Sequence, residues 1–99
     1  MRTFRNLRVA NLIQEELGKI ILREIEFGKS VLVTITGVEV SKDLSRATIK
    51  LGIFPSAGAK EAMDLIERYR PFLQRLLMKK INIKPMPRIV FELSSDKAS

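Results

Sequence analysis

The first regular hydrophobic pattern in the chain covers residues 7–26. Its apolar positions are Val9, Leu12, Ile13, Leu17, Ile20 and Ile21. Because they recur every three or four residues, they share one face of an α-helix. Asn6 is expected to cap the start of this helix, and Gly28 to close its end in the left-handed conformation. The pattern predicts an amphipathic helix that covers an apolar surface elsewhere in the chain.

Two segments with alternating apolar and polar residues follow, at 31–40 and 46–54. Both are rich in Val, Ile and Thr, which favour β-strands. Only the polar segment Ser41-Lys42-Asp43-Leu44-Ser45 separates them. Two alternating segments joined by so short a turn predict a β-hairpin with one apolar face. The first helix is the candidate to cover that face.

A second helical pattern runs from Ala62 to Ile81 and contains Pro71 near its middle. Proline lacks the N–H that would bond to the carbonyl four residues earlier, and its ring crowds that carbonyl. Because the apolar period continues across Pro71, the sequence predicts two helices joined at a kink. Pro85 and Pro87 then end the helical region.

The last segments complete the expected architecture. Residues 88–93 predict a third strand, and residues 94–99 a frayed tail. The order is helix, strand, strand, helix, kink, helix, strand. We therefore expect an α+β fold in one domain over residues 1–99, with helices covering one face of a three-stranded sheet.

Composition narrows the function further. The 99 residues contain no cysteine and no histidine, which removes disulfides, thiolate metal sites and the commonest general base. No motif pairs carboxylates for acid–base chemistry, so we expect neither an enzyme nor a cofactor, metal or small-molecule substrate. No continuous apolar segment is long enough for a signal peptide or a membrane span. A monomer in the cytoplasm is the expectation.

The positive charge is concentrated in one segment. Residues 68–88 carry seven Lys or Arg and no acidic residue, which equals the net charge of +7 for the whole chain. Such a segment favours a polyanionic partner, and its pattern indicates RNA. Charge that only keeps the protein soluble is the simpler alternative, and a protein-interaction module that docks on an acidic protein is another.

The geometry of the basic segment suggests a phosphate-binding surface. Arg68, Arg75 and Lys79 are spaced to share one stripe of the helical unit. Arg70 is expected at the start of the helix that begins at Pro71, where free backbone N–H groups attract anions. The residues predicted to contact RNA are Arg5, Arg8, Arg68, Tyr69, Arg70, Pro71, Arg75, Lys79, Lys80 and Lys84.

Several segments resemble the bacterial ribosome-binding factor A family. They are RVANLIQEEL at 8–17, VTITGVEVSKDL at 33–44, Ala47, FLQRLL at 72–77 and PRIVF at 87–91. The resemblance covers nearly all of residues 5–93, and the V-S-x-D-L turn is its most specific part. It implies a type II KH-like domain, whose element order matches the one expected above.

The same resemblance implies a function. Members of this family are non-enzymatic factors that bind the small ribosomal subunit and its rRNA late in assembly. They support maturation of the rRNA 5′ end and are often important in the cold. Their helix–kink–helix carries an A-x-G pattern, and the matching positions here are Tyr69-Arg70-Pro71. A proline therefore replaces the usual kink glycine.

Overall fold

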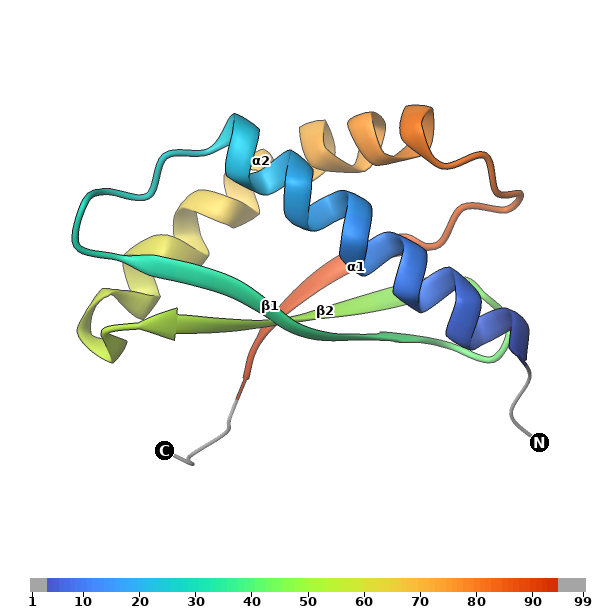
Figure 1. Cartoon of the computed structure of the whole chain (residues 1–99), viewed down its shortest axis with the longest axis horizontal. Helices are drawn as coiled ribbons and strands as arrows, with labels where there is room; N and C mark the ends of the chain where they lie inside the picture. The colour runs from blue at the N-terminus through green and yellow to red at the C-terminus, as the bar shows by residue number, and fades with distance from the viewer. Residues whose placement is uncertain (1–3, 95–99) are drawn as a thin grey trace.

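The structure is a computed structural model that describes residues 4–94. Its elements are α1 (Phe4–Glu24), β1 (Leu32–Val40), β2 (Arg46–Phe54), the short 3-10 helix η1 (Ser56–Gly58), α2 (Ala59–Lys80) and β3 (Arg88–Leu93). The three strands form one sheet in the order β1-β2-β3, antiparallel between β1 and β2 and parallel between β2 and β3. Both α-helices lie on the same face of this sheet (Figure 1). The predicted α+β architecture is confirmed.

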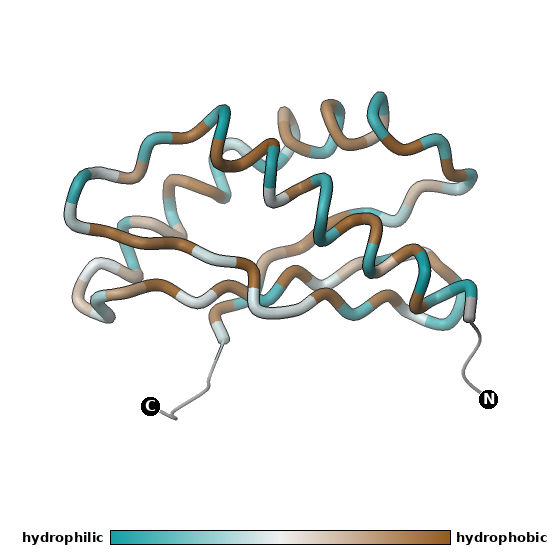
Figure 2. Tube along the Cα trace, in the orientation of Figure 1, coloured by the Kyte–Doolittle hydropathy of each residue, from teal (hydrophilic) through white to brown (hydrophobic). Residues whose placement is uncertain are grey.

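The core lies between the sheet and the two helices. Apolar and polar residues alternate along the strands and around the helices (Figure 2), so each element has one apolar face. From α1, the buried residues include Val9, Ile13, Leu17 and Ile20, with Ile13 and Leu17 fully inaccessible. They belong to one cluster with Ile49 and Leu51 of β2, Ile66, Leu73 and Leu77 of α2, and Ile89 of β3. The predicted helix–sheet packing is confirmed.

The expected caps of the first helix are wrong. The helix begins at Phe4 rather than residue 7, so Asn6 lies inside its first turn. The Asn6 side-chain Nδ2 instead donates to the carbonyls of Val40, at 3.2 Å, and Ser41, at 2.9 Å. Gly28 does have a positive φ of 111°, but α1 has already ended at Glu24. Asn6 therefore ties α1 to the β-hairpin.

A β-bulge in β1 sets which side chains face the core. Ile35 pairs with Leu51, but the next paired residue of β1 is Gly37, opposite Lys50. The extra residue, Thr36, shifts the alternation by one position. As a result Val38 and Val40 pack on the core beyond the bulge, as Val33 and Ile35 do before it. Without the bulge, Glu39 would point inward.

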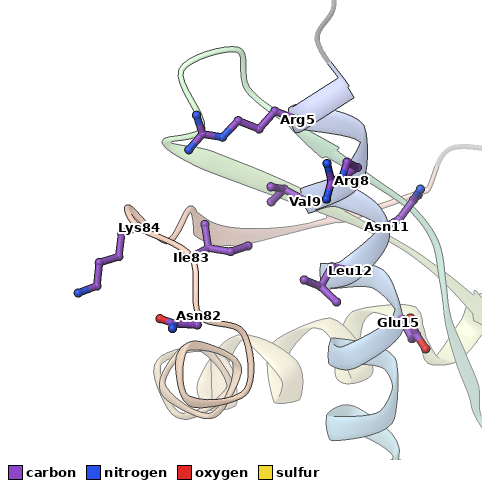
Figure 3. Close-up of a pocket in the computed structure, with 9 residues that line it drawn as sticks. All are labelled: Arg5, Arg8, Val9, Asn11, Leu12, Glu15, Asn82, Ile83 and Lys84. Carbon is purple, nitrogen blue, oxygen red and sulfur yellow. The ribbon is translucent and has the colours of Figure 1, made fainter.

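The second helical region is one helix rather than two. Helix α2 runs without interruption from Ala59 to Lys80 and contains Pro71. Figures 1 and 3 show its two halves running in different directions, so the expected kink exists as a bend within a continuous helix. No new helix begins at Pro71. The missing N–H of Pro71 leaves the Glu67 carbonyl without its helical donor, which is the opposite of an anion-binding N-terminus.

The last strand has the predicted bounds, Arg88–Leu93. Pairing continues one residue further, because the N–H of Ser94 donates to the Leu51 carbonyl at 2.7 Å. Ser94 is therefore held by the sheet rather than frayed. The rest of the predicted tail, residues 95–99, lies outside the described residues.

Candidate nucleic-acid interface

The basic side chains divide into those with a carboxylate partner and those without one. The paired ones are Lys19 with Glu15 and Glu16, Arg23 with Glu24, Lys50 with Glu39, Lys60 with Asp64, and Arg70 with Glu67. Within residues 4–94, the basic side chains that form no ion pair are Arg5, Arg8, Lys29, Lys42, Arg46, Arg68, Arg75, Lys79, Lys80, Lys84 and Arg88. These are the side chains free to neutralise a polyanion.

Most of the free basic side chains lie at one end of the molecule. Figure 1 shows the start of α1, the β1–β2 turn, the end of α2 and the loop before β3 at the same end. Hydrogen bonds fix this arrangement: Asn6 binds the turn at Ser41, and the N–H of Arg88 donates to the Ser45 carbonyl at 3.0 Å. We call this region the basic end and define it by Arg5, Arg8, Lys42, Arg46, Lys79, Lys80, Lys84 and Arg88.

A second group of basic side chains lies along the outer face of α2. Arg68, Arg75 and Lys79 are exposed and share the side opposite the buried Ile66, Leu73 and Leu77. The Arg75 guanidinium lies over the Phe72 ring, 5.9 Å from its centroid, and Phe72 meets the half-buried Tyr69 edge to face at 6.4 Å. This contact orients Arg75 while leaving its N–H groups available. The predicted stripe therefore exists, and it meets the basic end at Lys79.

Arg70 does not belong to that stripe. It lies five positions before Arg75, which places the two roughly 140° apart around the helix axis. The Arg70 Nε donates to Glu67 Oε1 at 2.9 Å. The prediction that Arg70 sits at a helix start is wrong, because α2 is continuous through the exposed Pro71. Arg70 has a carboxylate partner already, which weakens it as a phosphate ligand.

A hollow of about 800 Å³ separates α1 from the loop that follows α2. Three of the predicted RNA-contacting residues line it: Arg5 and Arg8 from α1, and Lys84 from the loop. Leu12 and Ile83 approach each other across it (Figure 3). Leu12, expected on the buried face of α1, is 39% exposed here. The structure thus brings together basic residues that lie at opposite ends of the sequence.

Sequence reasoning missed the pair of basic residues at the starts of β2 and β3. Arg46 and Arg88 are direct neighbours in the parallel β2–β3 register, and both are exposed. They line a hollow of about 650 Å³ together with Ser41, Asp43 and Ser45. Arg88 stood inside the basic segment but was not singled out. The parallel pairing that joins it to Arg46 has no local signal in the sequence.

Asp43 is the carboxylate beside this arginine pair. Its Oδ1 accepts hydrogen bonds from Ser45 Oγ at 2.7 Å, Ser41 Oγ at 2.8 Å and Ser45 N at 3.1 Å. These bonds, those of the Ser45 and Ser41 side chains first, lower the pKa of Asp43 from its ordinary value of 3.8. The Asp43 carboxylate thereby holds the turn through hydrogen bonds. The next residue of the turn, Leu44, has a positive φ of 61°.

Within residues 4–94, no group of three or more acidic side chains is placed to hold a metal ion. Neither α1 nor α2, in the part of the chain described, is long and apolar enough to cross a bilayer.

Comparison with known proteins agrees with this fold. A family model described as ribosome-binding factor A matches residues 5–98. Ribosome-binding factor A from Desulfitobacterium hafniense is 29% identical over 93 residues, which is 93% of this chain and 74% of that protein. The Pseudomonas paraeruginosa protein of that name is 32% identical over 90 residues, 88% of this chain and 70% of its own.

Solved structures of ribosome-binding factor A have the same architecture as this chain. The crystal structure of ribosome-binding factor A from Thermus thermophilus has a TM-score of 0.74 at 20% identity, covering 89% of this chain and 94% of that one. A homology model of the Thermus thermophilus protein, fitted into a cryo-electron microscopy map of its 30S complex, has a TM-score of 0.59 at 22% identity. It covers 82% of this chain and 90% of that one. The chain has the KH-like fold of these structures.

Proposed function

Because the chain belongs to the ribosome-binding factor A family, we propose that it binds the small ribosomal subunit through the phosphates of its rRNA. A relative with the same fold has been fitted into the map of a 30S complex, which supports this choice of partner. The contact surface of this chain is the basic end together with the α2 stripe of Arg68, Arg75 and Lys79.

The separation of paired from free basic side chains carries the proposal. Of the eleven basic side chains that form no ion pair within residues 4–94, eight lie at the basic end, whereas Lys19, Arg23 and Lys60 form ion pairs away from it. Charges needed only for solubility would be interspersed with carboxylates on every surface. Exposed guanidinium and ammonium groups without partners, gathered at one end of the molecule, suit the closely spaced phosphates of RNA.

The role we propose is that of a non-enzymatic assembly factor. The chain would act in the cytoplasm, late in small-subunit maturation, by occupying rRNA until the 5′ end is processed. Loss of the protein would reduce growth most clearly at low temperature. Binding alone suffices for such a role, because a protein that binds one rRNA conformation more tightly than another shifts their populations.

Charge reversal on the α2 stripe tests the proposal. The test variant is Arg75→Glu with Lys79→Glu, and the control is Lys29→Glu with Lys60→Glu, which makes the same change in net charge at exposed positions away from the basic end. Sedimentation with purified small subunits should show loss of binding for the test variant and retention for the control. Both should unfold within about 0.5 kcal/mol of the unmodified protein per site, since exposed substitutions rarely cost more.

Salt dependence provides a second readout. Each phosphate contact contributes a slope of about −0.7 to −0.9 in a plot of log affinity against log salt. The slope for the test variant should be shallower by the amount expected for the loss of about two phosphate contacts. Equal losses for test and control variants would instead mean that net charge matters and the surface does not. Binding to an acidic ribosomal protein, with no RNA dependence, would favour the protein-interaction alternative.

A further inference from the structure

The hollow between α1 and the loop after α2 combines an apolar floor with a basic rim. Its floor is formed by Val9 and Leu12 of α1 and by Ile83 of the loop. In Figure 3 the side chains of Leu12 and Ile83 point into the gap from opposite sides. Leu12 stays 39% exposed, although it lies on a helix whose neighbouring apolar residues, Val9 and Ile13, are buried. The floor therefore offers aliphatic surface to a ligand.

The rim of the hollow carries positive charge without local compensation. Arg5, Arg8 and Lys84 line it, and none of them forms an ion pair within residues 4–94. Glu15 is the acidic residue in the lining, but it pairs with Lys19 at 3.9 Å, and in Figure 3 it points away from the gap. A ligand that fits has an apolar part to cover the floor and negative charge to meet the rim.

We propose that this hollow takes a single unstacked base of single-stranded RNA, with the flanking phosphates on Arg5, Arg8 and Lys84. The inference rests on the proposed rRNA binding and adds which form of RNA this site selects. A nucleotide in an unpaired segment has the required combination, because its base can leave the stack while its phosphates stay charged. The volume of about 800 Å³ is in the range of pockets that enclose small ligands.

A double helix does not satisfy the hollow equally well. In a duplex the faces of the bases are stacked and only phosphates, sugars and base edges are accessible. Such a partner would contact the basic rim and leave Leu12 and Ile83 in water. A splayed base covers both side chains, and the guanidinium plane of Arg8, which lines the hollow beside Val9 and Leu12, can stack on its face. The aliphatic floor is thus the feature that distinguishes single strands.

A fluorescent base gives a direct test. The probe is a short single-stranded RNA with 2-aminopurine at one position, compared with the same RNA annealed to its complement. The protein should bind the single strand more tightly than the duplex at equal salt and should change the 2-aminopurine emission. The variant Leu12→Gln should weaken single-strand binding roughly five- to tenfold, because it removes apolar surface that the base would cover, and should leave duplex binding unchanged.

The matched control is Leu22→Gln. Leu22 lies on the same helix, is 81% exposed and is outside the hollow. Its substitution should change neither affinity. A second test variant, Ile83→Thr, reaches the floor from the loop and should act in the same direction as Leu12→Gln. The far-ultraviolet circular dichroism of each variant verifies folding, so that a loss of binding cannot be mistaken for unfolding.

The outcomes separate this proposal from the one on which it rests. Suppose that the unmodified protein and the Leu22→Gln control bind small subunits and RNA. If Leu12→Gln then weakens binding to single strands and duplexes equally, or weakens neither, the base-binding proposal is overturned and the proposal of rRNA binding stands. If Leu12→Gln weakens binding to intact subunits but not to any naked RNA, the occupant is a ribosomal protein, and the proposal is also overturned. Failure of the unmodified protein to bind subunits at all would overturn the proposed function itself.

Discussion

The side chain of Gln74 in α2 is hydrogen-bonded to the backbone of Ile89 in β3, with Gln74 Oε1 accepting the Ile89 N–H at 2.8 Å. Its Nε2 donates to the Pro87 carbonyl at 3.0 Å. The two bonds hold the backbone on either side of Arg88 and connect the helix that carries the basic stripe to the strand that follows the loop. Gln74 therefore positions the backbone of Arg88 without being a ligand itself.

Substituting Gln74 should destabilise the fold. Gln74→Ala leaves the Ile89 N–H and the Pro87 carbonyl without their partners in a half-buried site, and we expect a loss of about 1–3 kcal/mol in the free energy of unfolding. Urea denaturation measures this value. The control, Gln14→Ala, removes the single hydrogen bond from Gln14 Nε2 to the Ile35 carbonyl, at 3.3 Å, and should cost less. A smaller loss for Gln74 than for Gln14 would contradict this view of the helix–strand contact.

Ile13 tests the packing of α1 on the sheet. Its side chain is fully inaccessible, so Ile13→Ala should create a cavity and lower the free energy of unfolding by about 2–5 kcal/mol. Leu22→Ala is the control on the same helix, where 81% exposure predicts a change of no more than about 0.5 kcal/mol. Equal effects of the two substitutions in thermal or chemical unfolding would mean that α1 packs through another face.

The fold was largely predictable because its signals are local. Alternation of apolar and polar residues gave β2 its observed bounds, Arg46–Phe54, and β3 its bounds, Arg88–Leu93. The helical period identified Val9, Ile13, Leu17 and Ile20 as core residues, and all four are buried. Each of these inferences depends on neighbours a few positions apart, which the sequence displays directly.

The features that were missed depend on contacts between distant segments. Asn6 is a plausible helix cap by its residue type, but its acceptors lie more than thirty positions away, at Val40 and Ser41. Arg46 and Arg88 become neighbours only through a parallel strand pairing. The continuity of α2 at Pro71 is likewise outside local reasoning, because a bend can absorb the proline without ending the helix. The predicted candidate site thus lacked Arg46 and Arg88, and it included Arg70, which is paired with Glu67.

Asp43 should make the stability of the fold depend on pH in the acidic range. Its pKa is lowered in the folded protein, chiefly by the Ser45 hydroxyl. The charged carboxylate therefore favours folding at pH values above its ordinary pKa of 3.8. That contribution should be lost as the pH falls through the lower, folded-state pKa. We expect Asp43→Asn to melt below the unmodified protein at neutral pH and the gap to narrow on acidification below 3.8. A gap that stays constant across this range would show that the carboxylate charge is not what the turn uses.

The pair formed by Arg46 and Arg88 should lower the stability of the fold while contributing to the binding of small subunits. Arg46 and Arg88 are in-register neighbours on β2 and β3, where adjacent strands lie about 4.8 Å apart. Like charges at this spacing repel, and neither residue forms an ion pair within residues 4–94. Arg46→Gln should therefore raise the free energy of unfolding by about 0.2–1 kcal/mol. The same variant should bind small subunits more weakly, with a salt slope shallower by about one phosphate contact.

Lys42→Gln is the matched control for this pair. Lys42 is exposed in the neighbouring turn and belongs to the basic end, but it is not paired in register with another basic residue. It should lose affinity to a similar degree without any gain in stability. The decisive measurement is the sign of the stability change, taken from urea unfolding at low salt, where exposed charges are screened least. A loss of stability in Arg46→Gln would mean that Arg46 makes a stabilising contact with Asp43, and the pair would then be a structural feature of the turn rather than a phosphate site.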